Sequence, residues 1–237
     1  MNHIAKKSAI TIALVLIALL AFQAKAQWAV GVEAGYDYNS HHLNTQYAYD
    51  FRYEGRGGLT IGIPIEYRIF NWFAVRADLT YIERGFKMHR KYNETFQNRR
   101  DHYLSLPIMA RFMFGSQRIK GFLHAGGYVG YWLKSSLDGC EMSLTSIFDG
   151  MENKNNGKVF YSYQKDYTFN PTRDNRFDAG LAGGIGVSYR ILPRLEVEIE
   201  GRCYYGLTST TKHYMKHVKQ SRFNTTIAVL AGIKYCF

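Results

Sequence analysis

Three glutamates stand at alternate positions late in the chain, and an arginine continues the series. Glu196, Glu198, Glu200 and Arg202 are separated by single apolar or small residues. Alternate residues of an extended strand point to the same face, so the three carboxylates repel one another unless cations lie opposite them. Their chemistry is either proton transfer or ion pairing, and the partners on other strands decide between the two.

Catalysis would need a base beside a nucleophile or an activated water. The histidines within strand-like sequence are His102 and His124, and neither Ser nor Asp lies two residues from His124. We interpret Asp78 and Asp178 as partners of Arg76 and of other interior arginines. The sequence therefore predicts a protein that is not an enzyme.

Two histidine pairs have spacings that deserve a test against metal binding. His213 and His217 are four residues apart, which suits a metal on a helix. They fall in a loop with no acidic ligand beside them, and the pair His41 and His42 is equally isolated. We expect surface residues here, and no metal or cofactor.

The elements that must position the charged groups are strands. The chain has 19 Tyr, 15 Phe and 22 Gly but only 4 Pro, which is typical of a strand-rich protein. Eight segments alternate apolar with polar residues, and each fits the roughly 9 to 11 residues of a tilted membrane-spanning strand. They are 28–38, 57–69, 72–83, 102–114, 119–133, 176–190, 194–208 and 222–237.

One face of these segments carries no charged side chain. A soluble β-sandwich also alternates apolar with polar residues, but exposure to lipid gives a physical reason for a face without charge. The opposite face would line the lumen of a barrel and form an ion-pair network. Its charged members are Glu33, Asp37, Glu66, Arg68, Arg76, Asp78, Arg111, Asp178, Arg190, Glu196, Glu198, Glu200, Arg202 and Lys234. Arg190 and Lys234 are the expected partners of Glu196.

The connections alternate between short and long. Residues 70–71, 115–118 and 191–193 are short links, whereas long loops are expected near 39–56, 84–101, 134–175 and 209–221. Outward-facing aromatic residues gather at both ends of the strands, as they do at membrane interfaces. This pattern predicts an all-β fold, an eight-stranded antiparallel up-and-down transmembrane β-barrel with long extracellular loops.

The N-terminus has the three parts of a secretory signal peptide. Lys6 and Lys7 precede an apolar run of 15 residues, 8–22, and Ala24-Lys25-Ala26 supplies a cleavage site. We expect residues 1–26 to be removed and 27–237 to form one barrel domain in the outer membrane of a Gram-negative bacterium. The net charge of +11 for the whole chain then points to lipid phosphate and not to nucleic acid.

The three cysteines do not form a disulfide framework. Cys140, Cys203 and Cys236 are odd in number and lack metal-ligand spacing. In the expected register, Cys203 and Cys236 lie near opposite ends of neighbouring strands, too far apart for a bond. We expect both to be small buried hydrophobic residues.

Several motifs resemble known outer-membrane proteins. The ending Lys234-Tyr235-Cys236-Phe237 resembles the signal read by the barrel assembly machinery, through Tyr235 and Phe237. The segments 102–111 (HYLSLPIMAR), 121–130 (GFLHAGGYVG), 177–186 (FDAGLAGGIG) and 204–208 (YYGLT) resemble the PorT-like family of Bacteroidetes barrels. This resemblance implies an outer-membrane barrel and, for its founding member, a role in type IX protein secretion.

The expected function is a structural or interaction role, with secretion-system components as candidate partners of a monomer. The alternative is a small porin-like channel, but the interior of an eight-stranded barrel is just wide enough for side chains to fill. The loops would carry recognition, and their basic residues could contact phosphates of lipopolysaccharide in the outer leaflet or an acidic partner. These residues are Arg90, Lys91, Arg99, Arg100, Lys212, Lys216, Lys219 and Arg222.

Overall fold

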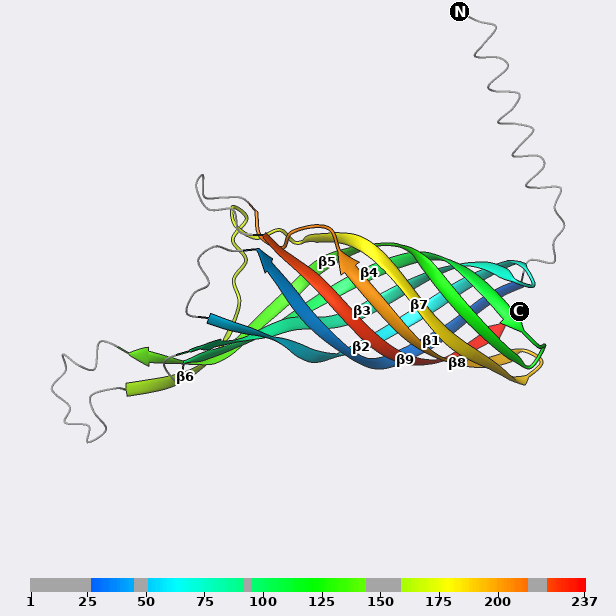
Figure 1. Ribbon diagram of the computed structural model, residues 1–237, viewed down its shortest axis with the longest axis horizontal. Helices are drawn as coiled ribbons and strands as arrows, with labels where there is room; N and C mark the ends of the chain where they lie inside the picture. Colours follow the sequence, from blue (N-terminus) through cyan, green and yellow to red (C-terminus); the bar gives the residue numbers. More distant parts are fainter. Residues whose placement is uncertain (1–26, 45–50, 92–94, 144–158, 213–220) are drawn as a thin grey trace, which may run out of the picture.

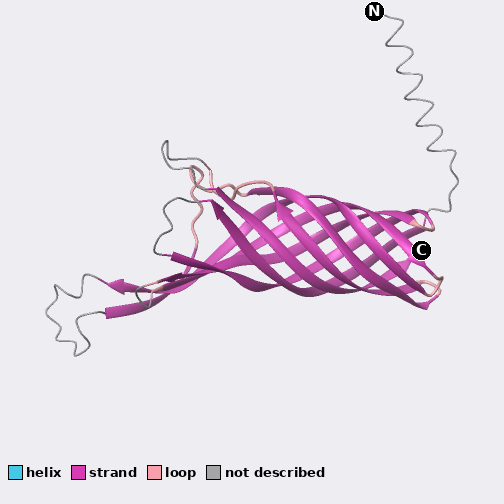
Figure 2. Ribbon diagram, viewed as in Figure 1, coloured by secondary structure: helices cyan, strands magenta, loops and turns pink. Residues whose placement is uncertain are grey.

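The computed structural model describes residues 27–44, 51–91, 95–143, 159–212 and 221–237 (Figure 1). Most of these residues lie in strands (Figure 2). In the described part of the chain, no helix is long and apolar enough to cross a bilayer. The strands are β1 (Gln27–Asn44), β2 (Phe51–Phe70), β3 (Phe73–Arg90), β4 (Phe96–Gly115), β5 (Ile119–Ser143), β6 (Val159–Asp166), β7 (Phe177–Leu192), β8 (Leu195–Gly206) and β9 (Ser221–Cys236).

Eight of the strands close into a barrel, as the alternation predicts. All neighbours are antiparallel, in the order β4, β3, β2, β1, β9, β8, β7, β5, and the pairing of β4 with β5 completes the ring. The first and last strands pair from Ala29 opposite Cys236 to Asn44 opposite Ser221. Closure satisfies the backbone groups of the spanning strands without water, which a bilayer requires.

The strands extend well into the loops predicted near 39–56, 84–101 and 134–175. β1 runs on to Asn44, β3 to Arg90 and β5 to Ser143. The strand that the prediction missed, β6, pairs with the outer part of β5, from Ser136 opposite Asp166 to Ser143 opposite Val159. Above the membrane both faces of a sheet can meet water, so the alternation that marks the spanning strands fades there.

These extensions form a sheet that projects from one end of the barrel. Phe51 pairs with Arg90, His89 with Phe96, and Phe96 with Cys140, so β2, β3, β4, β5 and β6 remain hydrogen-bonded beyond the ring. The C-terminus and the short turns lie at the opposite end (Figure 1). The β1–β2 pairs end at Asn39 opposite Arg56, whereas β1 and β9 stay paired to Asn44. β1 and β2 therefore separate at the mouth of the barrel that carries the projecting sheet.

The two faces of the barrel wall differ as predicted. Glu198 and Glu200 of β8 are at most 3% exposed, whereas Ile199 between them is 65% exposed. Outward aromatic residues are exposed at both ends, including Phe237 at the short-turn end and Tyr205 near the mouth. A face of this kind is stable only when lipid covers it.

The prediction of two buried cysteines is half wrong. Cys236 is buried at 7% exposure, but Cys203 is exposed. Its neighbours Arg202 and Tyr204 both point into the lumen, so strand geometry turns Cys203 toward lipid. All three cysteines are free.

The three short links lie where they were predicted. β2 ends at Phe70 and β3 begins at Phe73, β4 ends at Gly115, and β7 ends at Leu192. Gly115 has a φ of 121°, and a Cβ there would lie 2.7 Å from the carbonyl oxygen of Ile119. The β4–β5 turn therefore requires glycine.

Candidate functional site

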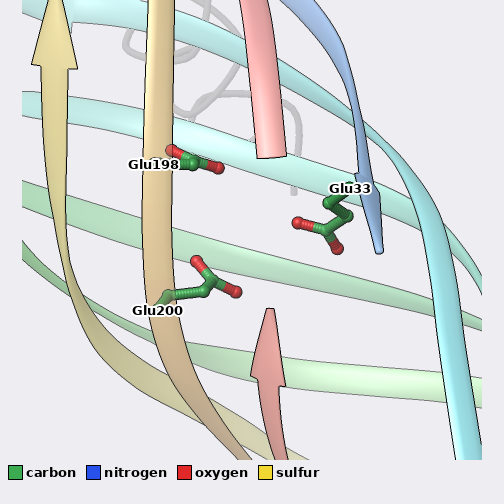
Figure 3. A group of neighbouring side chains, drawn as sticks. All are labelled: Glu33, Glu198 and Glu200. Carbon is green, nitrogen blue, oxygen red and sulfur yellow. The ribbon is translucent and has the colours of Figure 1, made fainter. Parts of the chain in front are cut away.

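Three carboxylates from two strands meet inside the barrel. Glu33 of β1 lies opposite Glu198 and Glu200 of β8, and oxygen atoms of all three lie within 4.8 Å of one another (Figure 3). Such a group could hold a metal only if its oxygens were free. Arg76 contacts all three residues, so their charge is already balanced by protein. The arrangement forms ion pairs and leaves no vacant ligand set among the described residues.

Arg76 lies at the centre of the group formed by Glu33, Glu198 and Glu200. Its guanidinium donates to Asp78 at 2.8 Å, to Glu198 at 2.6 Å and to Glu33. Arg202 supplies a second cation, 3.0 Å from Glu33 and 2.9 Å from Asp78, and also pairs with Glu200. Bidentate arginine contacts of this kind fix both partners in orientation.

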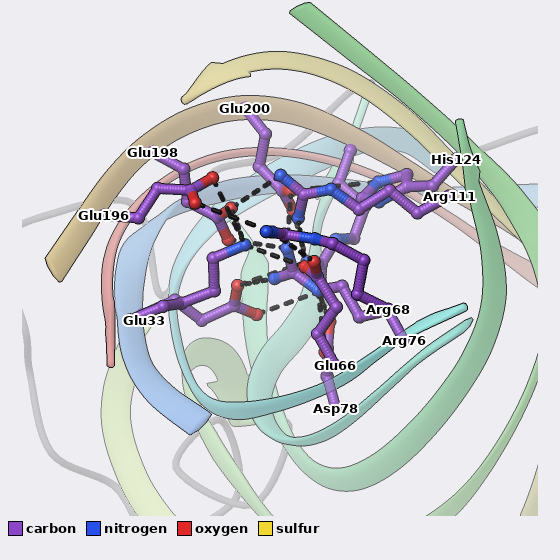
Figure 4. A network of polar contacts seen from close by, with 12 residues as sticks. Glu33, Glu66, Arg68, Arg76, Asp78, Arg111, His124, Glu196, Glu198 and Glu200 are labelled. Atoms are coloured by element: carbon purple, nitrogen blue, oxygen red, sulfur yellow. Dashed lines mark hydrogen bonds and ion pairs between the residues drawn. The ribbon is translucent and has the colours of Figure 1, made fainter. Parts of the chain in front are cut away.

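A second group of charges lies nearer the short turns. Lys234 donates to Glu66 at 2.8 Å and lies 2.8 Å from Glu198. Arg111 bridges the same two acids at 3.2 and 2.9 Å. Because Glu198 contacts Arg76 as well, the two groups form one network (Figure 4). Its members are Glu33, Glu66, Arg68, Arg76, Asp78, Arg111, His124, Glu196, Glu198, Glu200, Arg202 and Lys234.

The network is dry as well as charged. Arg76, Arg111, Asp78 and Glu66 are each 0% exposed. Taking such ions out of water costs several kcal/mol per ion, so each depends on its partners. A water-filled pore would leave these side chains wet, and here protein groups have replaced the water.

Three residues predicted for this network, Arg190, Asp37 and Asp178, lie outside it, and Asp178 pairs with Arg84 instead. Arg190 is only half-buried and makes no ion pair within the described ranges, and Arg68 takes its expected place, 3.6 Å from Glu196. The prediction for Arg190 is wrong because the residue lies beside the β7–β8 turn, where the lumen opens to water. Asp37 is buried and accepts a hydrogen bond from the Thr60 hydroxyl at 2.7 Å instead of an arginine.

Above the network lies a layer that the sequence did not reveal. Arg84 is 1% exposed and pairs with Asp178. Its guanidinium carbon lies 5.0, 5.3 and 5.7 Å from the ring centroids of Tyr103, Tyr128 and Tyr204. Arg84 falls at the start of the predicted loop 84–101, because the predicted strand ends at residue 83. Extending the alternation of β3 by one residue pair would have placed it in the lumen.

The predicted basic residues of the loops divide between two places. Arg99 and Arg222 line a cavity at the mouth that carries the projecting sheet, and His41 and Arg173 line it too. Arg90, Lys91 and Arg100 are exposed on the outside of the projecting sheet, and Lys212 donates to the Pro171 carbonyl at 2.9 Å. Lys216, Lys219, His213 and His217 lie outside the described residues.

The outer wall holds one histidine with an acid nearby. His102 Nδ1 lies 2.6 Å from the Tyr81 hydroxyl and 3.7 Å from Glu83. Within the described ranges, no Ser, Thr or Cys side chain hydrogen-bonds this ring. The cluster offers a base without a reactive nucleophile.

The C-terminal residues lie on the outside of the wall at the short-turn end. Phe237 is 67% exposed, and its backbone N–H donates to the Trp28 carbonyl at 2.9 Å. The rings of Tyr235 and Phe237 lie 5.2 Å apart. Both assembly-signal candidates therefore present their rings to the membrane.

Comparison with known proteins agrees with this architecture. Residues 22–212 match the family model described as an outer membrane protein beta-barrel domain. The search of curated proteins gave no match.

Solved structures of similar shape are small outer-membrane barrels. OprG from Pseudomonas aeruginosa has a TM-score of 0.54 and 9% identity, covering 90% of this chain and 96% of its own. Neisserial surface protein A has a TM-score of 0.45 and 17% identity, covering 89% and 97%. The attachment invasion locus protein Ail of Yersinia pestis has 0.40 and 13%, covering 87% and 98%. At these identities the likeness concerns the fold.

Proposed function

Because the chain belongs to the outer membrane protein β-barrel domain family, we propose that it is a non-enzymatic, non-conducting barrel that acts through contacts at its extracellular surface. The family places it in the outer membrane. The observation that carries the proposal is the dry lumen, in which Arg76 and Arg111 are 0% exposed. With the interior closed by ion pairs, the parts left to meet other molecules are the mouth and the projecting sheet.

The projecting sheet is built for contact. β6 pairs with β5 on one side, and Tyr161, Ser162 and Gln164 on it are exposed. A sheet edge presents backbone N–H and C=O groups to which an extended partner segment can pair. Strands held rigidly above the membrane also place such an edge at a fixed height.

A photo-crosslinking experiment tests this proposal. A photoreactive amino acid at Gln164 on β6 should form adducts with another protein in intact cells, whereas the same group at Ile199 on the lipid face should form lipid adducts. The matched position controls for expression and membrane insertion. Equal lipid-only labelling at both sites would contradict an interaction role.

The channel alternative needs a wet lumen. Steady ion flow would require the ion pairs of Arg76 and Arg202 to open, and each breakage would leave acids unpaired in a dry interior. The ion pairs in the lumen therefore favour a closed barrel over a porin-like channel.

A narrower role in type IX protein secretion is supported by the resemblance of segments such as 102–111 and 177–186 to the PorT-like family. Recovery of secretion-system components among the Gln164 adducts would support that role. Adducts with unrelated proteins alone would remove it while leaving the interaction role in place.

We also propose a second partner, the phosphates of outer-leaflet lipopolysaccharide, which the exposed bases Lys91 and Arg100 would contact. Each basic contact near an anionic surface is worth roughly 1 kcal/mol and weakens with salt. Lys91→Glu with Arg100→Glu should reduce copurifying lipopolysaccharide, more at low salt than at high, while Arg118→Glu at the opposite end should not. Unchanged lipid in both variants would mean that these bases only face water.

A further inference from the structure

The extracellular mouth contains a partly open cavity of about 250 Å³. It lies between the paired ends of β1 and β9, the outer parts of β2 to β5, and the segment 167–174. Basic groups enter it from three directions: Arg99 from β4, Arg222 from β9, and Arg173 from the segment before β7. His41 of β1 adds two more nitrogens.

The acids in this cavity already have partners. Asp101 accepts from Arg99 Nε at 2.8 Å. Asp174 accepts hydrogen bonds from the Tyr167 hydroxyl at 2.9 Å and the Asn170 amide at 2.8 Å, and it also pairs with Arg173. Their lone pairs are therefore largely occupied within the protein.

The basic groups, by contrast, keep donors to spare. Arg99 is 9% exposed, yet its Nη2 is buried without a hydrogen-bond partner among the described residues. Both ring nitrogens of His41 also lack a partner there, and the neutral ring offers one N–H donor. Arg222 has no carboxylate within ion-pair distance in the described ranges, and its guanidinium faces the Phe86 ring at 5.9 Å. A buried donor without an acceptor costs about 1–3 kcal/mol, which a ligand that accepts from it recovers.

Arg99 is also held in position before any ligand arrives. Its guanidinium carbon lies 4.6 Å from the Trp132 ring centroid and 4.3 Å from that of Tyr167. Trp132 in turn stacks on Tyr103 at 5.8 Å. A fork fixed between aromatic rings loses little entropy on binding, and arginine forks match the geometry of tetrahedral oxyanions.

We propose that this mouth cavity is a binding site for a small soluble oxyanion, a phosphate or sulfate group carried on a molecule no larger than one sugar. Arg99 and Arg222 contact the oxyanion, and the partly buried Tyr167 contacts the attached ring. The cavity is lined by residues of β1 to β5 and β9 and by the segment 167–174, and none of the exposed outward residues of the spanning strands lines it. The ligand therefore arrives from the external medium and not from a neighbouring lipid.

Tryptophan fluorescence gives a direct test on the full barrel in neutral detergent. The chain has three tryptophans, and Trp28 and Trp72 are exposed on the outer wall or at a turn, so Trp28→Phe with Trp72→Phe leaves Trp132 as the reporter. Inorganic phosphate, inorganic sulfate and a hexose 6-phosphate should each change its emission saturably. The neutral hexose should not.

The decisive variant is Arg222→Gln, because no ion pair of the described structure depends on this side chain. Loss of a charged hydrogen bond should weaken binding about tenfold or more. Arg52→Gln is the matched control, since Arg52 lies on the same projecting sheet but is 74% exposed outside the cavity. Unheated gel mobility checks that both variants are folded, and Arg222→Lys should bind with intermediate strength.

Two results would overturn the proposal. One is the absence of saturable binding by all three anions, and the other is equal binding by Arg222→Gln and Arg52→Gln. Displacement of the hexose phosphate by a phosphorylated glycolipid in micelles would overturn the soluble source, and lack of displacement supports it.

Discussion

Arg76 illustrates at the residue scale why a charged lumen can be stable. It is fully buried, and it contacts Asp78, Glu198, Glu200 and Glu33 from four directions. Within lipid the alternative location for these groups is a hydrocarbon face, where charge costs several kcal/mol. Strand alternation therefore forces the charges inward, and mutual pairing makes their burial tolerable.

Replacing Arg76 with alanine should leave several acids without their main cation. Removing one partner of a buried ion pair costs about 3–5 kcal/mol. The Arg76→Ala variant should therefore have a free energy of unfolding that is lower by an amount in that range. Urea unfolding in vesicles measures it. Arg190→Ala, which removes a half-buried arginine with no ion pair in the described ranges, should cost far less, and equal costs would contradict the network.

His41 provides a prediction about pH. Burial, and then the nearby Arg222 and Arg99, lower the pKa of His41 to about 3 from an ordinary value of 6.5. The folded protein therefore holds His41 in its neutral form. The contribution of His41 to the stability of the folded state is complete above pH 6.5 and declines as the pH falls toward 3. The His41 ring signal in NMR should show no inflection between pH 5 and 8. A midpoint near 6.5 would mean that the His41 ring itself is in contact with water.

At the element scale, the spanning strands were predictable and their extensions were not. Residues such as Ile199 and Glu200 alternate because lipid lies on one side and the lumen on the other, and that contrast marks the strand in sequence. Beyond Ile82 the contrast weakens, although Arg84 and Phe86 remain buried, at 1% and 4% exposure. β6 lies beyond the ring of spanning strands, so its sequence lacks the contrast between lipid and lumen that marks those strands.

The contrast between the lipid face and the lumen face also decides which candidate site residues can be identified from the sequence. The lumen acids of β8 repeat at a period of two and were identified directly. The sequence identifies Arg99 and Arg222 as basic residues of predicted loops. It does not show that they point inward, because that direction depends on strand pairing within segments predicted as loops. The aromatic rings around Arg99 come from β5 and the segment after β6, which no local pattern connects.

Deletion of Phe237 tests the C-terminal strand as an element. Its ring lies on the membrane face, and β9 closes the barrel against β1, so loss of the terminal aromatic should slow insertion in cells. Deleting residues 144–158 should leave insertion intact, because the described strands that form the ring lie outside this range. The fraction of heat-modifiable protein in outer membranes measures both, and equal insertion would count against an assembly signal.

At the scale of the whole molecule, the barrel has a filled interior and two ends of different structure. One end carries short turns and the other a tall sheet, while the interior is filled by the network of Figure 4 and by the layer around Arg84. This construction suits a protein that holds a surface at a fixed height above the membrane. It does not suit the passage of solutes.

Conductance across a planar bilayer tests the closed lumen most directly. Purified, folded barrel should insert and give no steady porin-sized current, because Arg76, Arg111 and Arg202 remain paired with acids across the interior. Insertion is verified by the heat-dependent gel shift of protein recovered from the same vesicles. A stable, porin-sized conductance from the wild-type protein would contradict the account.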